Sequence, residues 1–204
     1  EEIEQYRDRM WRREEALRVR TAADVEAMVD DLGFCLAMTD VRKRMPSVYI
    51  AVCGRRDAHM PRNVQKDEEA SAAWVLKDEV VERGRVYYGK IWKGHSMFIA
   101  PRLVPAFNSI YGCSKAGEAG VLSASARKVL SVLRREWEMA TADLREATGL
   151  SRAELTKAID ELQKRMKVIP QEVLYIPKFT YIWTIAESRF PGEMKVRMKR
   201  EDAV

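Results

Sequence analysis

The chain has 204 residues, of which 47% are hydrophobic and 33% are charged, and it carries 36 basic against 31 acidic side chains. These values are those of a compact folded protein with room for one large core or two small ones. The sequence shows neither a signal peptide nor a long apolar run, which argues against export and membrane spanning and favours the cytoplasm.

The first 120 residues are predicted to form a mostly helical domain with one β-hairpin. Caps and apolar spacing carry this prediction, because Thr21 begins a capping box and Ser47 can cap a short helix. The expected helices cover residues 1–20, 22–32, 48–52, 70–80 and 101–111. The hairpin has expected strands 86–92 and 96–100 with a turn at Lys93-Gly94, and residues 112–120 read as a linker.

A basic segment lies within this first half. Residues 41–66 carry seven basic side chains against Asp57 alone, a local excess of the kind that neutralises phosphates. Residues 55–69 lack periodicity, and a long loop in a compact protein is either functional or disordered. We expect DNA phosphate contacts from five of these residues: Arg42, Lys43, Arg44, Arg55 and Arg56.

Residues 121–204 are predicted to form a second domain, so that the whole chain is of the α+β class. A helix capped by Ser123 or Ser125 carries an apolar stripe that ends at Trp137. Thr141 can cap a second helix that ends at Gly149. A helix-turn-helix followed by a hairpin indicates a winged helix-turn-helix domain. In this motif the helix capped by Thr141 comes first, and the next helix begins at the Ser151–Glu154 capping box. The hairpin strands cover 168–175 and 180–185.

The polar face of the helix that begins after Ser151 makes double-stranded DNA the leading partner. Its residues are Arg152, Thr156, Lys157, Asp160, Gln163, Lys164 and Lys167. The first three are placed to reach base edges, whereas Lys164 and the hairpin residue Lys178 can hold phosphates. Such a domain can instead serve only for dimerisation or protein docking, so a homodimer remains open.

The ends of the chain and its cysteines suggest less about function. Residues 189–200 are basic without apolar periodicity, and we expect a mobile tail. Cys35, Cys53 and Cys113 are too scattered for a disulfide framework, and no Cys/His ligand spacing occurs. We therefore expect reduced, partly buried cysteines, no metal site and no cofactor.

Several blocks of sequence resemble the AlkZ-related proteins, which are relatives of the winged-helix DNA glycosylases that excise alkylated bases and unhook crosslinks. The blocks are Trp74-Val75-Leu76-Lys77-Asp78-Glu79 and Arg85-Val86-Tyr87-Tyr88-Gly89-Lys90, preceded by Gly33-Phe34 and Pro46-Ser47. The resemblance spans about residues 21–191 and implies a role in DNA repair.

The catalytic motif of those glycosylases is glutamine, an aliphatic residue, then glutamine or aspartate, and it holds the attacking water. Gln65-Lys66-Asp67 has the spacing but a charged middle residue, and we interpret the match as accidental. Asp78 and Glu79 are the better catalytic candidates, because Trp74 could stack on an extruded base while a carboxylate positions water. The alternative is that Trp74 is a core aromatic and that the charges lie in solvent.

Three classes of function therefore remain. The first is a winged-helix DNA-binding protein, the second a repair glycosylase or lesion-binding protein, and the third a protein-interaction module.

Overall fold

In the computed structural model, which describes residues 1–203, the chain divides into two units. Unit 1 comprises Glu1–Val86 and Ser96–Ala100, and unit 2 comprises Tyr87–His95 and Pro101–Val204. The fold is α+β, as predicted, with helices predominating over two small antiparallel sheets. Within residues 1–203, no helix combines the length and apolar character needed to cross a membrane.

Unit 1 is mostly helical, and two of its helices begin at predicted caps. The Thr21–Asp24 capping box and the Ser47 cap are both present, which confirms the prediction for two of these helices. The α-helices are α1 (Glu2–Met10), α2 (Ala22–Leu32), α3 (Val48–Cys53) and α4 (Glu68–Arg83). The short 3-10 helices are η1 (Glu15–Leu17), η2 (Val41–Lys43) and η3 (Val64–Lys66).

The predicted hairpin is present. Strands β2 (Tyr87–Trp92) and β3 (His95–Ile99) turn at Lys93 and Gly94, which both have positive φ, as a tight hairpin turn requires. Strand β1 (Phe34–Leu36) pairs antiparallel with β3, and the sheet order is β1-β3-β2. The division into units passes through this hairpin, whereas the sequence places a domain boundary after residue 120.

The predicted helix over residues 1–20 is wrong in its length, because α1 ends at Met10. Arg12 then adopts a positive φ of 56°. Arg12 pairs with Asp31 at 2.5 Å, and Arg13 Nε lies 3.0 Å from the buried carboxylate of Asp8. The charges that suggested one long surface helix instead attach a folded-back segment to the rest of unit 1.

Unit 2 contains the remaining elements. The helices between the hairpin and the second sheet are η4 (Pro101–Leu103), α5 (Val104–Tyr111), α6 (Glu118–Val121) and α7 (Ala124–Glu136). There follow β4 (Glu138–Ala140), α8 (Thr141–Thr148), α9 (Arg152–Lys164), β5 (Val168–Leu174) and β6 (Thr180–Ile185). The chain closes with α10 (Ala186–Arg189), α11 (Pro191–Lys195) and η5 (Arg200–Ala203).

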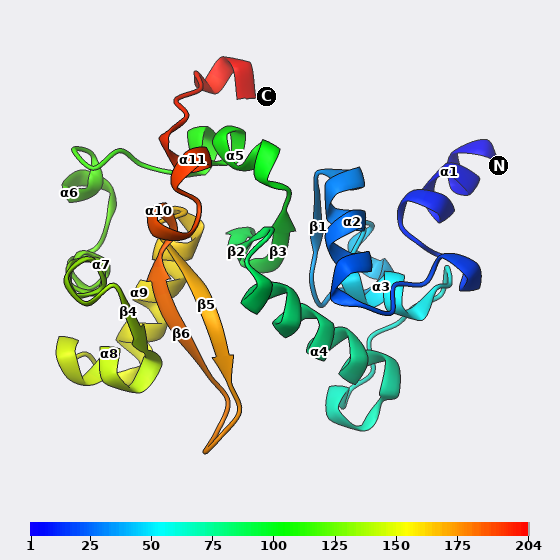
Figure 1. Ribbon diagram of the computed structural model, residues 1–204, viewed down its shortest axis with the longest axis horizontal. Helices are drawn as coiled ribbons and strands as arrows, with labels where there is room; N and C mark the ends of the chain where they lie inside the picture. The colour runs from blue at the N-terminus through cyan, green and yellow to red at the C-terminus, as the bar shows by residue number, and fades with distance from the viewer. Residues whose placement is uncertain (204) are drawn as a thin grey trace. The chain divides into compact units, whose positions relative to one another are not determined.

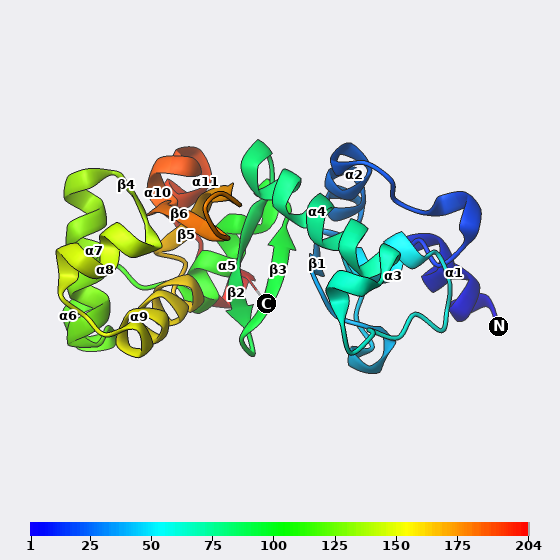
Figure 2. The same cartoon turned by 90° about the horizontal axis from the view of Figure 1, so that it is seen from below.

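The core of unit 2 lies where α7, α8 and α9 pack together beside a three-stranded sheet of order β4-β6-β5 (Figures 1 and 2). Leu133, Leu144 and Leu162 are fully buried there, and Trp183 of β6 joins them. The Ser123 cap of α7 and the Ser151–Glu154 capping box of α9 are present as predicted. These caps fix where α7 and α9 begin.

Two predictions in unit 2 are wrong, one that places Trp137 on the apolar stripe of α7 and one that makes Thr141 the cap of α8. Trp137 does not join the α7 stripe, because it follows the helix with a φ of 70° and its side chain is 68% exposed. Thr141 does not cap α8. Its hydroxyl donates to the carbonyl of Tyr181 at 3.2 Å and accepts the indole N–H of Trp183 at 3.0 Å. Thr141 therefore ties the start of α8 to the sheet.

Candidate nucleic-acid interface

The exposed side of α9 begins directly after its N-cap. Ser151 accepts the amide of Glu154, and the Glu154 side chain accepts the amide of Ser151 at 2.9 Å, so the first turn is fixed. Arg152, Thr156 and Lys157 are all exposed, as expected for residues that meet a partner. The Thr156 hydroxyl donates to the carbonyl of Arg152 at 2.9 Å, which leaves its oxygen to accept.

The second half of α9 is less exposed than the sequence suggests. Lys164 is exposed, but Gln163 and Lys167 are buried, so assigning these two to a solvent face is wrong. Gln163 accepts the backbone amide of Lys90 at 3.2 Å, and Asp160 pairs with the Lys90 ammonium at 2.9 Å. The helix thus packs on β2 as well as on the core, and the negative charge of Asp160 is compensated.

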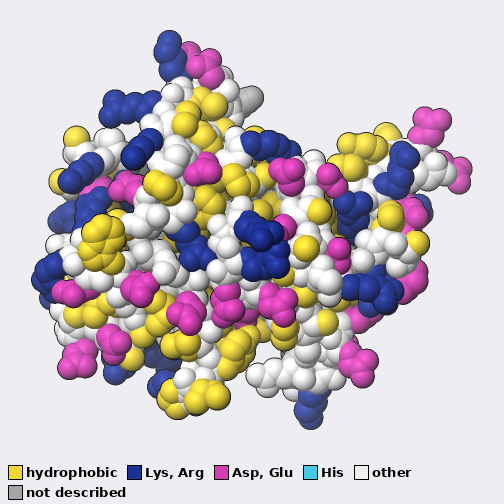
Figure 3. Space-filling view, viewed as in Figure 1, with side chains coloured by type: hydrophobic (Ala, Val, Ile, Leu, Met, Phe, Trp, Pro, Cys, Tyr) yellow, Lys and Arg dark blue, Asp and Glu magenta, His cyan; other side chains and the backbone are white. Residues whose placement is uncertain are grey.

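The tip of the β5–β6 hairpin is more apolar than its sequence suggested. Tyr175, Ile176 and Phe179 are 53%, 87% and 42% exposed, and Lys178 is exposed beside them. Figure 3 shows hydrophobic side chains gathered at this tip. An edge-to-face series of rings runs from Tyr175 through Phe179 towards the core. The apolar residues Ile176 and Phe179 in the turn sequence were the signal that could have predicted this surface.

Three of the five basic residues expected to contact phosphates are paired with carboxylates. Arg42 Nε lies 2.8 Å from Asp40, Arg55 contacts Glu69 at 2.5 Å, and Arg56 pairs with Asp8. All three carboxylates come from outside residues 41–66, and Asp40 immediately precedes the segment. The excess positive charge counted along the sequence is therefore partly compensated in the fold.

Lys43 and Arg44 differ from these arginines. Both are exposed, and neither forms an ion pair with another residue in the described range 1–203. They follow Asp40, which caps η2 by accepting the amide of Arg42 at 3.1 Å. Of the five basic residues expected to contact phosphates, these two keep their charges fully available.

Asp40 links η2 to the following loop. It accepts from the Arg42 guanidinium and from the amide of Met60 at 3.0 Å, and these contacts lower the pKa of its carboxyl to about 2. A carboxylate with a lowered pKa stabilises the fold above its unfolded pKa of about 3.9, and this contribution is lost as the pH falls towards the folded value.

Asp40→Asn should lower the free energy of unfolding at neutral pH by about 2 kcal/mol. Urea unfolding of both proteins should show this difference shrinking as the pH falls below about 4. An equal difference at all pH values would mean that the charge of Asp40 contributes nothing.

The Gln65-Lys66-Asp67 run has a structural role. Gln65 is exposed on η3, and its backbone amide donates to the side-chain oxygen of Asn63 at 3.2 Å. Asp67 is the N-cap of α4 and accepts the amide of Ala70 at 2.8 Å. A capping carboxylate is already committed to backbone donors, so it is poorly placed to hold an attacking water.

Asp67→Ala should lower the free energy of unfolding by about 1 kcal/mol, because it removes a helix cap. Gln65→Ala should leave both stability and any activity unchanged, since the Gln65 side chain is exposed. Thermal denaturation compares the stability of the two variants. A loss of activity in Gln65→Ala but not in Asp67→Ala would show that the run is catalytic.

Asp78 and Glu79 lie on α4 in different surroundings. Asp78 is buried and its carboxylate is 2.5 Å from the Lys77 ammonium, while Glu79 is exposed. Burial lowers the pKa of Lys77 even with Asp78 beside it. The Lys77 ammonium lies 4.1 Å from the centre of the Trp74 ring, and Trp74 is 36% exposed. Of the two carboxylates, only that of Glu79 is open to solvent in this structure.

Comparison with known proteins assigns the chain to a family. No curated protein and no solved structure matches the chain. The model of the AlkZ-related family matches residues 19–184, which include α2 to α9 and the hairpin β5–β6 except for its last residue. The chain therefore belongs to the AlkZ-related family.

Proposed function

We propose that unit 2 contains a winged-helix domain that binds double-stranded DNA. The support is the order of elements: α7, β4, α8, α9 and the β5–β6 hairpin follow one another, with strand order β4-β6-β5. A short turn at Gly149 joins α8 to α9, so α9 is the recognition helix and the hairpin is the wing. Family membership supplies the DNA-repair context for this proposal.

The observation that carries the proposal is a pair of exposed basic side chains without ion pairs at the start of α9. Arg152 and Lys157 are exposed and form no ion pair with any residue from 1 to 203. Of the nearby carboxylates, Asp160 is paired with Lys90. Glu154 accepts the amide of Ser151, and its charge partly offsets that of Lys157. The first turns of a recognition helix are the part that reaches base edges in the major groove.

The wing extends this surface. Ile176 and Phe179 at its tip suit the minor groove, where apolar side chains are used as wedges between base steps, while Lys178 can hold a phosphate. Lys164, exposed near the end of α9, is placed to hold another phosphate.

Fluorescence-anisotropy titrations with plain, abasic and alkylated duplexes at two salt concentrations test this function. A DNA-binding protein without lesion recognition should bind all three duplexes alike, with an affinity that falls steeply with salt. Preference for the abasic or alkylated duplex would support the repair function. Absence of binding would contradict the proposal and favour a protein-interaction module.

The second candidate function is base excision, and family membership is the observation that favours it. Asp78 and Glu79 remain its proposed catalytic residues, with Glu79 the one that solvent reaches. We expect no base release from an alkylated duplex by the wild-type protein. If release occurs, Glu79→Gln or Asp78→Asn should abolish it while preserving lesion binding.

Lys43→Gln with Arg44→Gln should weaken binding uniformly across DNA sequences and lower the salt slope by about two units, if each residue contacts one phosphate. Arg55→Gln with Arg56→Gln is the matched control, because it removes two charges that Glu69 and Asp8 already compensate. We expect a smaller change in slope for this control. Equal slopes for the wild type and the Lys43/Arg44 variant would exclude these two residues from the interface.

A further inference from the structure

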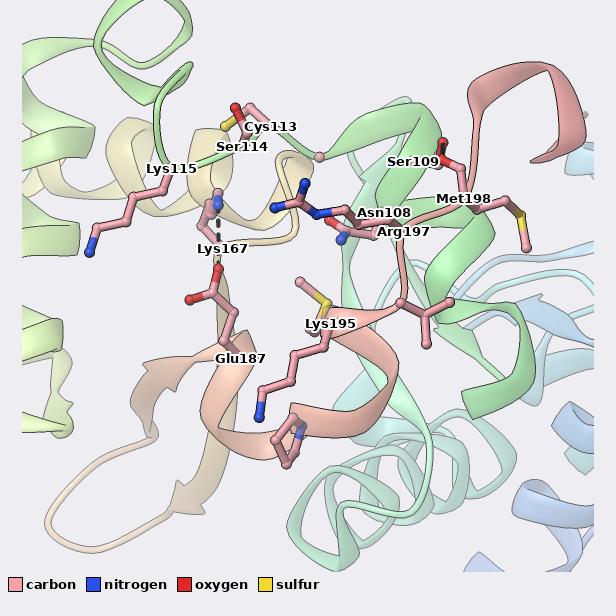
Figure 4. Close-up of a pocket in the computed structure, with 14 residues that line it drawn as sticks. Asn108, Ser109, Cys113, Ser114, Lys115, Lys167, Glu187, Lys195, Arg197 and Met198 are labelled. Carbon is pink, nitrogen blue, oxygen red and sulfur yellow. Dashed lines mark hydrogen bonds and ion pairs between the residues drawn. The ribbon is translucent and has the colours of Figure 1, made fainter.

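A cavity of about 650 Å³ lies in unit 2, away from the exposed start of α9. Its walls come from the end of α5, the loop after it, the turn before β5, and the segment from α10 to Met198 (Figure 4). This volume is within the range of small-molecule sites. The segment expected to be a mobile tail contributes one wall, where the carbonyl of Met198 accepts the Ser109 hydroxyl at 2.8 Å.

The cavity is lined by four cations and one carboxylate. The cations are Lys115, Lys167, Lys195 and Arg197, and the carboxylate is Glu187. Within the described part of the chain, three of these cations form no ion pair, namely Lys115, Lys195 and Arg197. The lining therefore carries a surplus of three positive charges, which favours an anionic ligand.

Lys167 is the fixed member of this set. Its side chain is 5% exposed, and its ammonium lies 3.1 Å from Glu118 and 3.5 Å from Glu187. Arg134 also binds Glu118, with two contacts of 2.7 Å, so the carboxylates do not leave a net negative charge. An ammonium has three N–H donors, and two carboxylates leave one for a ligand. In Figure 4 the Arg197 guanidinium extends towards Lys167, whereas Lys115 extends outward.

Neutral donors and an apolar wall complete the lining. The amide of Asn108 and the hydroxyl of Ser114 can donate to an anion's oxygens, and Met194 and Val196 can cover a carbon framework. Burial raises the pKa of the Cys113 thiol, so the cavity is equipped to bind rather than to attack.

We propose that this cavity binds the phosphomonoester group of a ligand up to the size of a nucleotide, held by Arg197 and Lys167. The exposed Lys195, whose ammonium extends beyond Glu187 in Figure 4, can turn to reach the same group. A phosphomonoester carries close to two negative charges and three acceptor oxygens, which matches several cations with nearby donors. The ligand can be a free phosphorylated compound or the 5′-phosphate end of a DNA strand. The site is separate from the proposed interface on α9, and it does not depend on DNA binding there.

The test is calorimetric titration of the whole protein with inorganic phosphate and with deoxyadenosine monophosphate. Lys195→Gln with Arg197→Gln should weaken both affinities roughly tenfold or more, because it removes two charge-assisted contacts. Lys199→Gln with Arg200→Gln is the matched control, since it removes the same charge from neighbouring residues that do not line the cavity. Thermal denaturation should show all three proteins equally folded.

Anisotropy with a short single strand, with or without a 5′-phosphate, identifies the source of the group. A preference for the phosphorylated strand that is lost in the Lys195/Arg197 variant supports a DNA end as the ligand. Equal binding of the two strands, together with binding of the mononucleotide, supports a free compound. Absence of phosphate and mononucleotide binding, or equal losses in the variant and the control, would overturn the proposal.

Discussion

Replacing Arg152 and Lys157 together with alanine is expected to weaken duplex binding about 30-fold or more, because each of the two lost recognition contacts costs about 1–3 kcal/mol. Both side chains are exposed and lie opposite the buried Leu155 and Ile159, so the melting temperature should stay nearly unchanged. Anisotropy titration and thermal denaturation of the same preparations measure the two effects. A fold defect would lower both.

The control for this variant is Lys128→Ala with Arg135→Ala, which removes the same charge from exposed positions on α7. If both double variants lose affinity equally, net charge rather than α9 determines binding. If the Arg152/Lys157 variant binds as tightly as the wild type, α9 lies outside the interface.

Leu162→Ala should lower the free energy of unfolding by about 2–5 kcal/mol, the usual loss for truncating a buried leucine. Leu162 is fully buried within the core formed by α7, α8, α9 and Trp183. Urea unfolding followed by circular dichroism measures this loss. Val121→Ala offers a control in unit 2, because Val121 is 42% exposed and its truncation should change stability by less than about 0.5 kcal/mol. Similar small losses in both variants would mean that the core is not packed as described.

Local signals in the sequence predicted much of the secondary structure. The capping boxes at Thr21 and Ser151 and the cap at Ser47 are present because a cap and the first turn of its helix interact over only three residues. Glycines with positive φ end α2 and α8 for the same local reason. Such features depend on neighbouring residues and can be read without knowing the fold.

Contacts between distant residues could not be read in this way. The end of α1 depends on Arg12 meeting Asp31, and the burial of Gln163 depends on Lys90, which lies 73 residues away. Trp137 looked like one more member of a helical stripe, but the chain turns at that residue and leaves it exposed. Periodicity predicts which residues share a face while a helix continues, and it does not predict where tertiary contacts end the helix.

The candidate interface also combines features that follow from local sequence with features that depend on distant residues. Exposure of Arg152, Thr156 and Lys157 follows from their spacing relative to the buried residues of α9. The availability of their charge does not, because it depends on Lys90 compensating Asp160. In the basic segment the sequence count overstates the available charge, since Arg56 is paired by Asp8, which lies 48 residues away. Charge along a sequence predicts an electrostatic surface only after ion pairing is known.

Backbone amide chemical-shift mapping with a short duplex tests the proposed DNA interface most directly. The proposal predicts that the amides from Ser151 to Lys157 and those around Lys178 shift most on titration, because α9 and the wing contact the DNA. It also predicts that these shifts diminish as salt is added. Shifts confined to unit 1, with the amides of α9 and the wing unmoved under saturating duplex, would contradict it.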